Sequence, residues 1–138
     1  MAQTNALSPF LSVRDVAAAV DFYRAAFGAA EVGERLHAPD GSVVALLEID
    51  GFTVGLATER PDLQTPSPET AGGTTVRISL HVDDPDAAAA RAVAAGAHEL
   101  FPVADQPYGL RQGRVVDPFG HHWLLARPLR DDDEDGNG

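Results

Sequence analysis

Two adjacent histidines, His121 and His122, lie in the stretch DPFGHHWLLA near the end of the chain. Imidazole is a common metal ligand and a general base near neutral pH, so the pair raises the question of a catalytic metal centre. The alternative is a strand that begins with two histidines. The chain contains no cysteine, which excludes thiolate metal sites and cysteine nucleophiles. All ten of its basic residues are arginine, which excludes lysine Schiff-base chemistry.

Composition and charge narrow the class of partner. With 138 residues, 44% of them hydrophobic, the chain is long enough for one domain with a core. Its net charge of −11 argues against a nucleic-acid partner, because binding phosphates requires a basic face. No apolar run could span a bilayer and the N-terminus lacks a secretion-signal pattern, so we expect a cytoplasmic protein with no membrane partner. We expect residues 129–138 to be a disordered acidic tail.

The chain also contains an internal repeat. Asp15 and Asp84 are separated by 69 residues, and so are Gly51 and Gly120. Each half reads as a strand, a helix and three further strands. This order predicts an α+β fold with two tandem βαβββ modules, at about 7–58 and 74–128, joined by a linker at about 59–73 that is rich in Pro, Thr, Ser and Gly. Because neither module could bury its sheet face alone, we expect one domain over 1–128.

The limits of the elements follow from caps, turns and alternation. Asp15 can cap a helix that runs to about Phe27, with Gly28 following it, and Pro85 suits the first turn of a second helix that ends near Ala95. The strands are expected at 9–13, 30–36, 42–49, 52–57, 75–82, 98–103, 110–116 and 121–126.

Alternation along the strands separates two sheet faces. One face is uniformly apolar and includes Trp123, which we expect in the core against the helices. The other face mixes small, polar and cationic side chains and is either solvated or a binding surface. It holds the candidate ligand-binding residues Phe10, Ser12, Thr53, Arg77, Ser79, His81 and His122. His121 and His122 point to opposite faces of a regular strand, so they cannot both ligate one ion.

The stretches SVRDVAAAVDFYRAAFGA and GRVVDPFGHHWLLA, set in two tandem modules, resemble the vicinal oxygen chelate superfamily. Within it they are most similar to glyoxalase/bleomycin-resistance-like proteins of the PhnB-like branch. The resemblance covers about 7–128 and implies a curved mixed sheet around a cavity, and a homodimer. It leaves the activity open, because this superfamily hosts isomerases, dioxygenases, thiol transferases and drug-binding proteins.

The resemblance also implies where a metal would be held. The positions that carry ligands in metal-dependent members are Ser8, Gly55, Arg77 and Leu124 here. Glycine and leucine offer no ligating side chain, serine is a poor ligand and arginine is a fixed cation, so we expect no metal or other cofactor and no catalytic residue at this set. The alternative is a displaced divalent-metal site built from His81 and His122, with Glu48 or Asp117 as a third ligand. Either histidine could also be a general base.

Two further features bear on a ligand. Arg77 on an inward face needs compensation, either from a salt bridge to a residue such as Glu48 or from a carboxylate, phosphate or enolate oxygen of a ligand. The segment 102–113 has the Gly and Pro content of a mobile lid, and the resemblance to PhnB-like proteins implies that it lies over the pocket mouth. In it, Tyr108 could stack on a planar ligand and Arg111 could close on an anion.

These observations favour a metal-independent protein of the bleomycin-resistance type that binds a small molecule, such as an antibiotic or an aromatic compound that it sequesters. An antibiotic-resistance role would follow from that. The alternatives are a glyoxalase-type lyase or isomerase, metal-dependent or based on His81 or His122, and a regulatory pocket without turnover.

Overall fold

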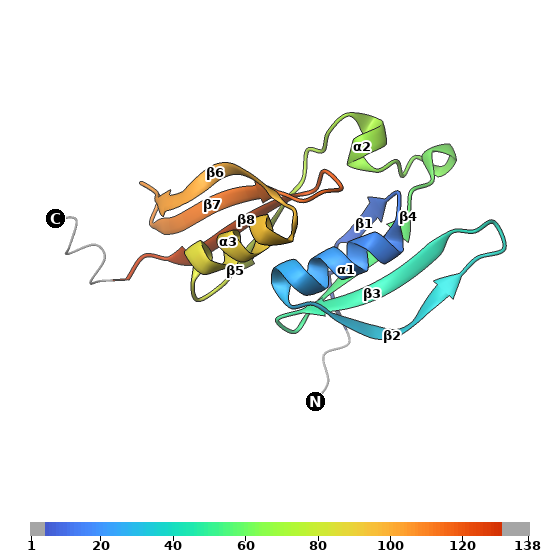
Figure 1. Cartoon of the computed structure of the whole chain (residues 1–138), viewed down its shortest axis with the longest axis horizontal. Helices are drawn as coiled ribbons and strands as arrows, with labels where there is room; N and C mark the ends of the chain where they lie inside the picture. Colours follow the sequence, from blue (N-terminus) through green and yellow to red (C-terminus); the bar gives the residue numbers. More distant parts are fainter. Residues whose placement is uncertain (1–4, 131–138) are drawn as a thin grey trace. The chain divides into compact units, whose positions relative to one another are not determined.

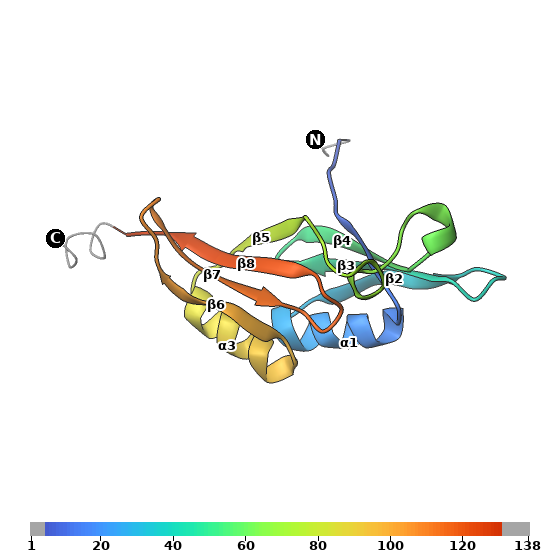
Figure 2. The same cartoon turned by 90° about the horizontal axis from the view of Figure 1, so that it is seen from above.

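The computed structural model describes residues 5–130, and the chain divides into two compact units at the Gly73–Thr74 boundary. Each unit contains one βαβββ module, in which a four-stranded mixed sheet carries a helix on one face (Figures 1 and 2). Neither sheet closes into a barrel. The α+β class and the two repeated modules are therefore confirmed. That both modules build one domain around a shared cavity stays a prediction.

The elements lie close to the expected limits. In the first unit they are β1 (Phe10–Val13), α1 (Val16–Phe27), β2 (Ala30–His37), β3 (Val43–Ile49), β4 (Phe52–Thr58), the short 3-10 helix η1 (Pro61–Leu63) and α2 (Pro68–Ala71). In the second unit they are β5 (Arg77–His81), α3 (Pro85–Ala95), β6 (His98–Asp105), β7 (Leu110–Val116) and β8 (His122–Pro128). The sheet orders are β1-β4-β3-β2 and β5-β8-β7-β6.

Both long helices begin and end where the sequence places them. The Asp15 side chain accepts a hydrogen bond from the Ala18 backbone N–H at 3.1 Å, and Gly28 follows α1 with a left-handed φ of 68°. The Asp84 side chain caps α3 in the same way, through the Ala87 N–H. Each helix buries one side against its own sheet, where the alternate residues of the strands are apolar. Trp123 is fully buried there, as expected.

The strand registers show the repeat directly. β1 pairs with β4 in parallel so that Phe10 lies beside Gly55. β5 pairs with β8 in parallel so that Ser79 lies beside Leu124. Both members of the second pair lie 69 residues after those of the first, so the shift predicted from Asp15 and Asp84 holds for the strand register as well.

The segment between the modules is more ordered than a bare linker. It contains η1 and α2, and Ser67 caps α2 by accepting from the Thr70 N–H. The Glu59 carboxylate accepts from the Ser67 N–H and the Thr70 hydroxyl, which ties α2 to the end of β4. The Pro and Gly content predicted an irregular path, and the polar side chains between the Pro and Gly residues supply these local bonds.

Two further expectations concern the acidic tail at the C-terminus and the absence of a membrane-spanning segment. Most of the expected acidic tail, residues 131–138, lies outside the described residues, while Leu129 donates its N–H to the Gly109 carbonyl. Among residues 5–130, no helix has both the length and the apolar character that crossing a bilayer requires.

Candidate functional site

The second unit presents a sheet face that α3 does not cover, called the open face below. Trp123, Leu125 and Val115 are buried on the α3 side, so the alternate residues of the same strands lie on the opposite side. The registers arrange these residues in three cross-strand rows. They are Arg77–His122–Val116–His98, Ser79–Leu124–Arg114–Phe101, and His81–Ala126–Gln112–Ala104.

The histidine stretch that suggested a metal is organised around an aspartate. Asp117 is buried, and its Oδ1 accepts from the backbone N–H groups of Phe119 and His121 at 3.0 and 2.9 Å. Its Oδ2 accepts from the Trp123 indole N–H at 2.9 Å. Because both oxygens hold the turn between β7 and β8, Asp117 serves a structural role, and the suggestion that it is a third metal ligand is not supported.

The registers also separate the two histidines of the alternative metal site. Arg77 lies beside His122, whereas His81 lies beside Ala126, four residues further along β8. At ~3.3 Å per residue the two backbone positions are about 13 Å apart, too far for both side chains to ligate one ion. The register therefore does not support a shared metal site of His81 and His122. Among residues 5–130 no group of three His, Asp or Glu side chains is placed to hold a metal.

In the first unit, the position equivalent to a metal ligand is covered by an aromatic ring. A Cβ added at Gly55 would lie 2.5 Å from the Phe10 ring, so this ring rests directly on the glycine backbone. Phe10 is nonetheless 59% exposed, because its other ring face is open. Ser12 and Thr53 lie on the same sheet face as Phe10, as alternation predicted. Together with Leu124, Arg77 and the exposed Ser8, Gly55 makes a set that does not fit a divalent metal.

Two arginines of the open face have no acidic partner. Neither Arg77 nor Arg114 forms an ion pair with the described residues of the second unit, and the Arg114 Nε is buried without any hydrogen-bond partner. The Arg114 guanidinium lies over the Phe101 ring, 5.2 Å from its centroid. Sequence reasoning missed Arg114, although pairing β7 with β8 in antiparallel register would have placed it beside Leu124.

A hollow of about 180 Å³ lies beside Arg114. Phe101, Tyr108 and Leu124 supply its apolar surface, and Gln106 and Gln112 supply amides. The Tyr108 hydroxyl donates to the Gln112 Oε1 at 2.7 Å, and the Gln106 amide donates to the Gln112 carbonyl at 3.0 Å. Tyr108 therefore lies beside the open face, as the lid hypothesis required, and its hydroxyl is hydrogen-bonded to Gln112.

Arg111 does not join this site. Its strand register places it on the α3 side, where its guanidinium binds Asp86 at 2.7 Å and Asp105 at 2.9 Å. These two carboxylates raise the pKa of Arg111 further above its ordinary value. The expectation that Arg111 closes on a ligand anion is therefore corrected, because alternation along β7 directs its side chain to the other face.

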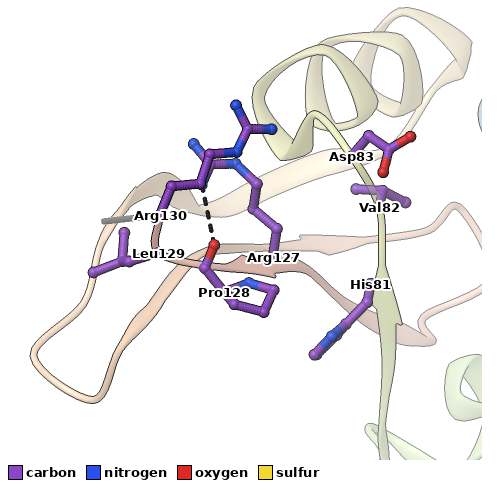
Figure 3. Close-up of a pocket in the computed structure, with 7 residues that line it drawn as sticks. All are labelled: His81, Val82, Asp83, Arg127, Pro128, Leu129 and Arg130. Carbon is purple, nitrogen blue, oxygen red and sulfur yellow. Dashed lines mark hydrogen bonds between the residues drawn. The ribbon is translucent and has the colours of Figure 1, made fainter. Parts of the chain in front are cut away.

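A second hollow, of about 390 Å³, lies where β5 and β8 end (Figure 3). His81 and Pro128 lie on one side of it, while the Arg127 and Arg130 side chains run next to each other on the α3 side (Figure 3). The Arg127 guanidinium donates to the Pro128 carbonyl at 3.1 Å. His81 thus faces a different hollow from the one beside Arg114.

The surroundings of His122, on the open face, lower the pKa of its imidazole. Burial, and then the positive charge of Arg114, hold its pKa below the ordinary value of 6.5. The folded protein therefore binds a proton on His122 less readily than the unfolded chain does. Neutral His122 therefore favours the folded state. This contribution to the free energy of unfolding is fully present above pH 6.5 and is lost as the pH falls from 6.5 through the lower pKa of the folded protein.

We therefore predict that Arg114→Gln raises the pKa of His122 toward 6.5, because the second-largest cause of its depression is removed. An NMR titration of the His122 ring protons in both proteins measures this shift. Arg91→Gln, on the exposed side of α3, is the control and should leave the titration unchanged. An unchanged His122 titration in Arg114→Gln would contradict the electrostatic contact.

The two βαβββ modules pair equivalent strand residues, and in each module one face of the sheet is not covered by the helix. This arrangement defines a class of small proteins built from two repeated modules. The chain belongs to the Glyoxalase/Bleomycin resistance protein/Dioxygenase superfamily, whose family model matches residues 5–125.

The relatives found by comparison agree with this membership. An uncharacterized protein of Mycobacterium tuberculosis is 48% identical over 130 residues, covering 91% of this chain and 76% of the relative. The crystal structure of TioX from Micromonospora sp. ML1 is 30% identical, with a TM-score of 0.65, and covers 91% of this chain and 98% of that one. The fosfomycin resistance protein FosX from Listeria monocytogenes, complexed with Mn(II) and sulfate, is 16% identical with a TM-score of 0.68 over 96% and 98% of the two chains. At 16% identity, the similarity to FosX shows a common fold only.

Proposed function

We propose that the protein is a metal-independent small-molecule-binding protein of the glyoxalase/bleomycin-resistance type. The observation that carries the proposal is the Phe10 ring on Gly55, which fills a ligand position of the metal-dependent relatives with an apolar group. The equivalent position in the second unit is Leu124, which lines a hollow together with its neighbour Arg114 and with Phe101, the partner of Arg114 on β6. Both positions thus offer surface for an organic ligand in place of donors for a metal ion.

The proposal includes several finer points that came from the sequence. They are the PhnB-like branch, a homodimer, a cytoplasmic location consistent with the lack of cysteine, and sequestration of an antibiotic or aromatic compound, which would give antibiotic resistance. A nucleic acid is not among the proposed partners, since the chain carries a net charge of −11. A membrane is not among them either, since the sequence has no apolar run long enough to span a bilayer.

The prediction that follows concerns metal content. Untagged protein exposed in turn to zinc, nickel, manganese and ferrous iron, then freed of unbound ions, should retain far less than one ion per chain by elemental analysis. The reason is that Ser8, Gly55, Arg77 and Leu124 provide no adequate donor set.

Close to one bound ion per chain would contradict metal independence. His122→Ala is then the informative variant, since loss of the ion in it would place the metal on the open face. His37→Ala is its matched control, because His37 is an exposed histidine at the end of β2 in the first unit.

A further inference from the structure

We propose that the open face of the second unit binds a planar organic anion, an aryl carboxylate, with Arg114 as its principal anchor and Arg77 as a second cation. This inference rests on the proposed small-molecule binding and deepens it by naming the class of ligand.

The first argument is the charge of the face. The three cross-strand rows of the open face, all within the described part of the chain, contain two arginines and three histidines. None of the residues in these rows is an Asp or a Glu. The whole chain carries a net charge of −11, so a region without acidic side chains stands out from the rest. The acidic residues of β6, Glu99 and Asp105, lie in register with Val115 and Arg111 on the α3 side. The open face therefore has an anion preference that the net charge conceals.

The second argument is the state of Arg114. Other arginines of the protein are committed to carboxylates, among them Arg35 to Glu31 and Arg111 to Asp86 and Asp105. Arg114 instead has a buried Nε without a hydrogen-bond acceptor, a costly arrangement in a folded protein. A small rotation of the Arg114 side chain would turn Nε toward the hollow, where a carboxylate accepting from Nε and one terminal nitrogen would satisfy this donor in the bidentate geometry that guanidinium groups favour.

The third argument is the shape and lining of the hollow beside Arg114. Leu124 and Tyr108 offer flat apolar surface, and the Phe101 ring already holds one side of the guanidinium plane. Arg77 lies outside this hollow, on the same sheet face and two strands from Arg114, where it adds a second positive charge. The volume of about 180 Å³ is below the usual range for drug-sized ligands, which favours a compound of one or two rings.

The test compares 2-naphthoate with its neutral isostere 2-naphthamide on the full chain by isothermal titration calorimetry, at neutral pH and low ionic strength. We expect 2-naphthoate to bind at least about tenfold more tightly than the amide, the effect of one charge-assisted pair. We expect Arg114→Gln to weaken 2-naphthoate binding by at least about tenfold and Arg114→Lys by an intermediate factor, because lysine keeps the charge but loses the fork.

Arg91→Gln, on α3, is the matched control for the same loss of charge and should bind 2-naphthoate as the wild type does. Arg77→Ala should keep its far-UV circular dichroism spectrum and weaken binding, which provides a second variant if Arg114→Gln fails to fold. Equal loss in Arg91→Gln would reduce the effect to overall charge and overturn the inference.

Two further results would also overturn it. If 2-naphthamide bound as tightly as 2-naphthoate, the anion preference would be wrong while small-molecule binding remained in place. If neither compound bound at millimolar concentration, the aryl carboxylate would be wrong as a ligand class. The broader proposal would fail separately, and only if a chemically diverse set of neutral and cationic aromatic compounds also showed no binding in the same calorimetry.

Discussion

Replacing Asp117 with alanine should lower the free energy of unfolding by about 3 kcal/mol, the largest single-residue effect we predict. Its carboxylate accepts three hydrogen bonds, from the Phe119 and His121 backbone N–H groups and from the Trp123 indole. Asp117 and Trp123 are both buried, so the three donors could not all regain water when the carboxylate is removed. The variant should also loosen the start of β8, where His122 begins the strand.

Urea denaturation followed by far-UV circular dichroism measures this loss without relying on the fluorescence of Trp123. Asp117→Asn is the conservative control. It keeps an oxygen for the two backbone donors but turns an amide N–H₂ toward the indole N–H, so we expect a smaller loss than for alanine. In a Trp123→Phe background the additional cost of Asp117→Asn should shrink, because the opposing donor is gone. A loss below about 1 kcal/mol for Asp117→Ala would contradict the role assigned to this carboxylate.

Local signals in the sequence were sufficient to predict the two long helices and the eight strands, but not η1 and α2. Asp15, Gly28 and Pro85 are local sequence signals that mark where the two long helices begin or end. The alternation of apolar and polar residues along the strands showed which side of each sheet is apolar. Given that Phe10 pairs with Gly55 in the first module, the shift between Asp15 and Asp84 leads to the pairing of Ser79 with Leu124 in the second. These features depend on neighbours in sequence or on the repeat, and both can be read directly.

The candidate site was predicted less well because it depends on the order of strands in the sheet. Arg114 and Phe101 become neighbours only when β6, β7 and β8 pair, and β6 shifts its register at Phe101 and again by Ala104. No local pattern predicts such a shift. The role of Asp117 was missed for a related reason, since a buried carboxylate near two histidines suggests a metal until the Trp123 indole is seen to occupy its second oxygen.

The second large effect is expected at Gly113, where the structure leaves no room for a side chain. A Cβ there would lie 2.8 Å from the Val103 backbone nitrogen and 2.9 Å from its Cα. Those atoms belong to the part of β6 where the register shifts between Phe101 and Ala104, so the backbone itself would have to move. We expect Gly113→Ala to lower the free energy of unfolding by about 2 kcal/mol, the usual cost of overpacking.

Gly55→Ala is the matched control, because the same substitution meets a different obstacle. The added Cβ would lie 2.5 Å from the Phe10 ring, but this ring is 59% exposed and can rotate away into solvent. Its cost should therefore stay below about 1 kcal/mol in the same urea denaturation. Gly113→Ala should in addition weaken 2-naphthoate binding, since moving β6 displaces Phe101 from the Arg114 guanidinium. Equal losses of stability for Gly113→Ala and Gly55→Ala would mean that the β6 backbone moves aside at as little cost as the exposed Phe10 ring. The shift in β6 would then not be what holds Phe101 against Arg114.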